Sequence, residues 1–206
     1  MKKANSVTNV KNLTLLALMT TLVVVFQLIG NFVPLGFNVG AFALVPIVIG
    51  AALLGPMAGA WLGTIFGIVI IVTGGASAFY TLIKPQWLGV TATVLVVIIK
   101  GALAGFVSGL VYKLIAKKSS FAAIITASVL CPVVNTVIFT LASFTIFFPG
   151  ISVWATGVGK NMISYVFLVL IGANFFVELG ICLIFSTVAD RIIRIGKKMR
   201  HDKSYI

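Results

Sequence analysis

The chain has 206 residues, of which 61% are hydrophobic and only 9% are charged, and its mean hydropathy is +1.22. A soluble domain of this size has too few polar groups to cover so much apolar surface, so the composition excludes a soluble globular protein. It predicts an all-α, polytopic membrane protein whose apolar side chains face lipid or neighbouring helices.

Apolar runs predict six transmembrane helices, which form a single membrane domain over residues 1–206 with short basic tails at 1–12 and 191–206. The second run is short for a full crossing, because Gly55 and Pro56 end it abruptly and begin the third. In chain order the expected helices cover about 13–30, 40–54, 56–73, 91–115, 121–147 and 163–190.

Six crossings place both termini on one side of the membrane, and the basic residues indicate which side. The opposite side has Lys84 and Lys160, while Lys100 falls inside the fourth helix. By the positive-inside rule both termini are cytoplasmic, so the net charge of +12 reflects topology and attraction to anionic lipid, and no nucleic acid partner is expected. The twelve basic residues on the terminal side are Lys2, Lys3, Lys11, Lys113, Lys117, Lys118, Arg191, Arg194, Lys197, Lys198, Arg200 and Lys203.

The sequence contains few residues that are suited to catalysis or to metal binding. The only histidine, His201, lies in the charged tail, and Cys131 and Cys182 stand alone in apolar helices, so no metal site is expected. The acidic residues are Glu178, Asp190 and Asp202, and the last two lie at the basic tail. No carboxylate pair is therefore available in the membrane for acid–base work, and we expect neither catalytic residues nor an enzyme.

Nucleotide binding is not expected either. The segment 157–161 is similar to the end of a P-loop, but Trp154 stands where the first glycine belongs and Asn161 replaces the Ser or Thr. Uphill transport by this chain would therefore need a partner that uses ATP, or an ion gradient.

A thin layer of polar residues lies at matching depth in the predicted helices. Lys100 is about nine residues into the fourth helix, roughly 12–14 Å below the outer boundary at 1.5 Å per residue. Asn135 and Asn174 fall at similar depth, with Glu178 one turn deeper on the face of Asn174, and Gln27 approaches the level from the first helix. Polar groups here are costly against lipid, so we expect them to point into the bundle.

Two interpretations of this layer compete. In the first, Lys100 pairs with Glu178 and the amides cross-link helices, which is a structural role. In the second, these side chains line a pocket, open to the outside, for a small polar molecule. A common depth favours the pocket, because cross-linking does not require it. The excess of lysine in the outer half favours an anionic or carboxylate-bearing ligand.

The two longer outer loops, residues 73–89 and 147–161, are candidate lids over this pocket. Their aromatic residues are equally typical of membrane-interface anchors. The further candidate binding residues in these loops are Lys84, Trp87, Lys160 and Asn161.

Glycine recurs at every fourth position from Gly55 to Gly67 in the stretch GPMAGAWLGTIFG. In lipid such a pattern leaves a groove almost without side chains, where another backbone can approach closely. Either this groove packs internally on the first or fourth helix, or Gly59 and Gly63 form a face on which a partner protein docks.

The sequence also resembles the vitamin-binding S component of energy-coupling factor (ECF) transporters, in the branch that includes pantothenate, folate and riboflavin binders. The similarity covers about residues 10–196. The motifs that carry it are PIVIGAALLGPMAGAWLGTIFG (46–67), GGASAF (74–79), KGALAGFVSGLVY (100–112), CPVVNT (131–136) and NFFVELG (174–180).

The resemblance implies a six-helix subunit of a bacterial plasma membrane, with cytoplasmic termini, that captures a vitamin outside. It also implies partnership with a membrane coupling protein and two ATPase subunits, so that ATP is used by the partners and this chain needs no cofactor. Family members often carry Ala-x-x-x-Ala on the first helix as the docking surface, and the nearest match here is Ala17 to Thr21.

Pantothenate is the expected substrate, because its carboxylate suits Lys100 and its hydroxyl and amide groups suit Asn135 and Asn174, with Glu178 as orienting partner or hydroxyl acceptor. Two alternatives stay open. One is an S component for riboflavin, folate or a pyrimidine precursor, and the other is a stand-alone secondary transporter of a small organic anion.

Overall fold

The computed structural model describes residues 2–32 and 42–201, and these residues form helices and turns without a strand. A helix is found in each of the six expected ranges. These helices are α1 (Lys2–Phe32), α2 (Leu44–Leu54), α3 (Pro56–Val72), α4 (Gln86–Ile115), α5 (Ser120–Thr145) and α8 (Ala173–His201). Four shorter elements were not expected: a 3₁₀ helix η2 (Ser77–Thr81), α6 (Phe148–Gly157), α7 (Met162–Ser164) and a π-helix η3 (Tyr165–Gly172).

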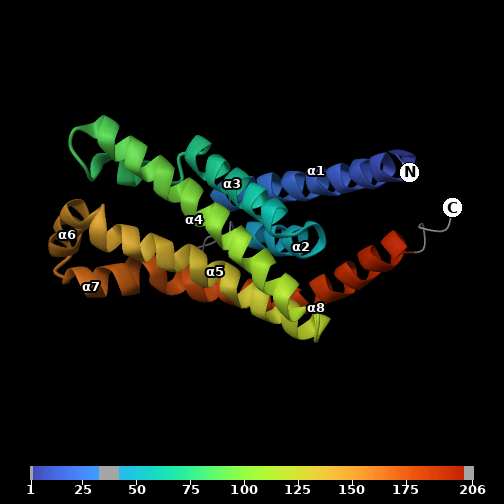
Figure 1. Ribbon diagram of the computed structural model, residues 1–206. Helices are drawn as coiled ribbons and strands as arrows, with labels where there is room; N and C mark the ends of the chain where they lie inside the picture. Colours follow the sequence, from blue (N-terminus) through green and yellow to red (C-terminus); the bar gives the residue numbers. More distant parts are fainter. Residues whose placement is uncertain (1, 33–41, 202–206) are drawn as a thin grey trace.

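The helices form an elongated bundle in which consecutive long helices run in opposite directions (Figure 1). The beginning of α1 and the end of α8 lie at the same end of this bundle, on the right of Figure 1, together with the turn between α4 and α5. We call this the terminal end. The opposite end is covered by α6, α7 and the connection that contains η2.

Four helical segments in the described part of the chain are long and apolar enough to cross a membrane: Val10–Gly30, Gln86–Ile115, Ser120–Thr145 and Met162–Ile193. The other two apolar helices are shorter, since α2 has 11 residues and α3 has 17. At 1.5 Å per residue, α2 is only about 16 Å long, about half of a bilayer core. Gly55, with φ of 101°, supplies the turn that stops α2, and Pro56 opens α3 at a position where its missing N–H costs nothing.

The glycine groove of α3 faces α4. A Cβ atom placed on Gly63 would collide with the carbonyl group of Gly101, and one on Gly59 would collide with the carbonyl of Gly105. The same holds in reverse, because a Cβ on Gly101 or Gly105 would meet the carbonyl oxygen of the α3 glycine opposite it. The two backbones thus touch directly along the crossing, and only glycine permits this approach.

This packing decides between the two uses considered for the groove. The face is internal, and α4 occupies it. The docking role considered for Gly59 and Gly63 is corrected accordingly, because a partner would have to displace α4 to reach them.

Candidate substrate-binding site

A cavity of about 310 Å³ lies between α4, α5 and the last helical segment, on the side of η2 and η3. Its size is at the lower end of the range for small-molecule sites. Four side chains of the predicted polar layer are among the residues that line it. The lining residues in the described part of the chain are Gly75, Phe79, Lys100, Asn135, Thr136, Phe139, Val169, Leu170, Ile171, Asn174, Phe175 and Glu178.

Lys100 and Glu178 give this cavity one cation and one carboxylate. They come from α4 and α8 and are close enough to interact electrostatically. The Lys100 ammonium also lies over the ring of Phe139, with Nζ 5.5 Å from the ring centroid. A cation on an aromatic face is stabilised by the ring quadrupole, so Phe139 helps to hold this charge inside the bundle.

Asn135 and Glu178 present hydrogen-bond acceptors that the protein leaves unused. The Asn135 side chain is 5% exposed and hydrogen-bonds to Glu178. Asn135 Oδ1 and Glu178 Oε2 are nevertheless buried and have no hydrogen-bond partner. A buried polar atom without a partner costs free energy, and a ligand that donates hydrogen bonds here would recover it.

The π-helix η3 forms one wall of the cavity through Val169, Leu170 and Ile171. A π-helix is wider than an α-helix and is uncommon at this length, and short π segments are frequent at functional sites. It leads directly into Asn174 and Glu178, which are four residues apart on α8. The irregular turn therefore sets the direction in which these two polar side chains enter the bundle.

Phe79 of η2 closes the cavity on the side of α6. Its ring contacts the rings of Phe139, Phe147 and Trp154, with centroid separations of 5.6, 5.5 and 5.8 Å. A second hollow of about 70 Å³ shares Gly75, Phe79 and Lys100 with the main cavity. The Phe79 ring thus stands between the cavity and the covering helix, as a lid residue would. The sequence predicts a lid role for this loop, and Phe79 is a residue of the loop that lines the cavity.

The remaining candidate binding residues do not line the cavity. All three lysine and tryptophan candidates are exposed at the end away from the termini: Lys84 and Lys160 lie in connections, and Trp87, 69% exposed, lies in the first turn of α4. Asn161 caps α7, since its side-chain oxygen accepts a hydrogen bond from the Ser164 N–H at 2.8 Å. Gln27 is buried on α1, which packs mainly on α2 and α3 and so lies apart from the cavity walls.

Two other predicted features can be located. Ala17 and Thr21 are exposed on α1, and the Thr21 hydroxyl donates to the Ala17 carbonyl at 3.0 Å. These two side chains are small, and the larger Leu13 and Val25 are exposed one turn away on either side. Cys131 and Cys182 are free and buried. Within residues 2–32 and 42–201 no cluster of His, Cys, Asp or Glu could hold a metal ion.

Comparison with known proteins identifies a family. Neither a curated protein nor a solved structure matches the chain significantly. A family model described as "ECF transporter, substrate-specific component" matches residues 11–189, which includes every residue that lines the cavity. This chain therefore belongs to the family of substrate-specific components of ECF transporters.

Proposed function

We propose that this multi-pass membrane protein is the pantothenate-binding subunit of an ECF importer, and that the cavity around Lys100 is its substrate site. Subunits of this family act with an ECF module of coupling protein and ATPases on a small-molecule substrate. The observation that carries the finer proposal is the gathering of Lys100, Asn135, Asn174 and Glu178, from three helices, around one small cavity.

The chemistry of these groups is complementary to pantothenate. Among the described residues that line the cavity, Lys100 is the only cation, and it suits a single carboxylate. Asn135 Oδ1 and Glu178 Oε2 need donors, which the two hydroxyl groups and the amide N–H of pantothenate provide. Asn174 is exposed beside them and can contact the same polar chain from the cavity mouth. A ligand without an acid would leave Lys100 without a counter-charge from the substrate.

Binding to a panel of vitamins tests this proposal. With the purified protein in detergent, isothermal titration calorimetry should show pantothenate binding at least about tenfold tighter than riboflavin or folate, a difference of about 1.4 kcal/mol. Riboflavin lacks a carboxylate, and folate carries two together with a large ring system. Equal or tighter binding of riboflavin would assign the cavity to another vitamin.

Membrane orientation and docking complete the proposal. We place both termini in the cytoplasm and the end with η2 and α6 outside, with α2 and α3 completing six membrane segments although each is short. The exposed small side chains of Ala17 and Thr21 on α1 are then available to the coupling protein, since none of the described helices covers them. A stand-alone transporter would take up substrate without the ATPase partners, whereas this subunit should take it up only with them.

Phe79→Ala is predicted to open the cavity without removing a polar contact. The substitution deletes three aromatic contacts and joins the cavity to the adjoining hollow. Since each aromatic pair contributes about 0.5–1.5 kcal/mol, we expect bound pantothenate to dissociate at least about tenfold faster. Stopped-flow displacement measures this rate.

Ser77→Ala is the matched control for Phe79→Ala, because Ser77 lies in the same 3₁₀ helix, is exposed and does not line the cavity. Its dissociation rate should equal that of the unmodified protein. A Phe79→Ala protein that releases ligand at the unmodified rate would show that Phe79 is not a lid.

A further inference from the structure

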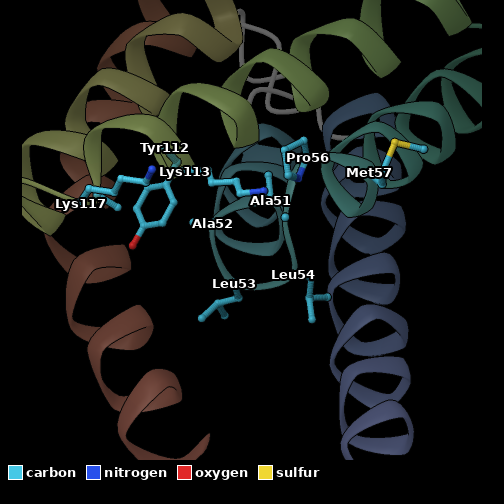
Figure 2. A pocket seen from close by; sticks show the side chains of 11 residues that line it. Ala51, Ala52, Leu53, Leu54, Pro56, Met57, Tyr112, Lys113 and Lys117 are labelled. Carbon is cyan, nitrogen blue, oxygen red and sulfur yellow. The ribbon is translucent and has the colours of Figure 1, made fainter. Parts of the chain in front are cut away.

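A larger hollow, of about 550 Å³, lies at the terminal end of the bundle and is separate from the Lys100 cavity. It is formed where the turn between α2 and α3 faces the last two turns of α4. Figure 2 shows Tyr112, Lys113 and Lys117 on one side of it, and Ala51, Pro56 and Met57 on the other. The substrate site does not use any of these residues.

The lining combines positive charge with apolar surface. Lys113 and Lys117 are four residues apart on α4, so they lie one above the other on one helix face, and both are exposed. No acidic residue is among the described residues that line the hollow. The rest of the lining is mostly aliphatic: Ala51, Ala52, Leu53, Leu54, Gly55, Pro56, Met57 and Ala116.

The nearest buried carboxylate is that of Asp190. It lies behind the residues that line the hollow and already accepts a hydrogen bond. The Ser120 hydroxyl donates to Asp190 Oδ1 at 3.3 Å, and the Tyr112 hydroxyl lies 3.4 Å from the same Ser120 oxygen. These contacts join α4, α5 and α8 beside the hollow. The wall of the hollow is therefore held in place by these contacts. Asp190 is not among the residues that line the hollow, so it does not neutralise the two lysines.

The position of the hollow indicates which ligand fits it. α4 is a membrane-crossing helix by length and composition, and Lys113 and Lys117 lie in or just after its last turn, where a membrane helix emerges at the headgroup level. The hollow also opens widely between helices instead of being enclosed in the bundle. Two neighbouring cations beside aliphatic surface at this depth are complementary to an amphiphile with an anionic head and acyl chains.

We propose that this hollow binds the headgroup of an anionic phospholipid, with the phosphate at Lys113 and Lys117 and the glycerol and upper acyl region against Pro56 and Met57. A docked acidic protein segment would satisfy the lysines, but it would leave unexplained why the hollow continues into aliphatic surface at the level of the bilayer. The lipid accounts for both features.

Native mass spectrometry of the full chain tests the proposal. The protein is released from detergent containing equal amounts of phosphatidylglycerol and phosphatidylcholine, which have similar chains but differ in net charge. The unmodified protein should retain phosphatidylglycerol at least about tenfold more than phosphatidylcholine. The double variant Lys113→Gln/Lys117→Gln should lose this preference, to within about twofold of equal retention.

Lys118→Gln is the matched control, since Lys118 is exposed at the same end and does not line the hollow. It should keep the full preference, and thermal unfolding in detergent should show that all three proteins are folded. A double variant that retains as much phosphatidylglycerol as Lys118→Gln would overturn the proposal. So would unchanged lipid retention with loss of binding to the ECF module, which would assign the hollow to a protein partner.

Discussion

Lys100→Met is expected to lower the affinity for pantothenate about 100-fold, or about 2.8 kcal/mol. Lys100 is the one cation among the cavity-lining residues that the structure describes, and a hydrogen bond to a charged group contributes about 1.5–3 kcal/mol. Methionine is one atom shorter and lacks the ammonium that lies over the Phe139 ring, but it remains apolar and flexible, so the substitution removes the charge more than the volume. Isothermal titration calorimetry measures the change.

A loss of folding has to be distinguished from a loss of binding in this variant. Removing Lys100 leaves Glu178 buried without a counter-charge, which is costly for the folded protein. The double variant Lys100→Met/Glu178→Gln removes both charges, so its thermal stability should recover while pantothenate binding stays weak. Lys160→Met, in an exposed connection outside the cavity, should change the affinity less than about threefold. Unchanged affinity in Lys100→Met would return Lys100 to a purely structural role.

Gly63→Leu is expected to prevent stable folding. A Cβ atom alone at this position would already collide with the Gly101 carbonyl group, and a leucine side chain adds three more carbons. Overpacking in a close-packed interface costs about 1–3 kcal/mol and sometimes more, and here the obstacle is backbone that cannot rotate away. We expect an apparent melting temperature at least about 10 °C lower in detergent, or no monodisperse protein in size-exclusion chromatography.

Ala17→Leu provides the contrast, because it adds bulk to an exposed face of α1. This variant should fold and bind pantothenate normally, but it should no longer co-purify with the coupling protein if that face is the docking surface. Gly63→Leu protein that folds, binds pantothenate and fails only in complex formation would contradict the internal packing of α3 on α4.

Most of the bundle follows from the sequence, because helix formation in lipid depends on apolar length. The expected ranges 56–73 and 91–115 correspond to α3 and α4, whose observed bounds differ by one residue at most except where α4 begins at Gln86. That early start has a local reason, since Pro85 has an extended backbone and stands as the N-cap residue, so that the helix begins directly after it. The sequence pattern alone did not decide which helix fills the glycine groove.

The candidate site is predicted from the depth of its polar residues in the membrane helices, and no sequence motif contributes to this prediction. Equal depth along three helices is enough to suggest that Lys100, Asn135 and Asn174 approach one another, and Glu178 joins them by its four-residue spacing from Asn174. All four line the cavity. The loop candidates are predicted from their charge, polarity or aromaticity, and these properties do not indicate the direction in which a loop side chain points. They are Lys84, Trp87, Lys160 and Asn161.

Two features of the site had no usable signal in the sequence. The π-helix over Tyr165–Gly172 lies in an unbroken apolar run, and apolar periodicity does not distinguish an extra residue per turn from a regular helix. Phe79 belongs to a loop whose folding depends on tertiary contacts with Phe139, Phe147 and Trp154. Phe79 ends the GGASAF segment, directly before Tyr80, and this position does not indicate the direction in which its ring points.

The central claim is that Lys100 binds the carboxylate of the substrate inside this cavity. It is tested most directly by measuring two ligands against two proteins: pantothenate, and pantothenol with a hydroxymethyl group in place of the carboxylate, each with the unmodified protein and Lys100→Met. The unmodified protein should prefer pantothenate about 100-fold, and Lys100→Met should bind both ligands equally weakly. A Lys100→Met protein that still prefers pantothenate would show that the carboxylate is bound elsewhere and would contradict the account.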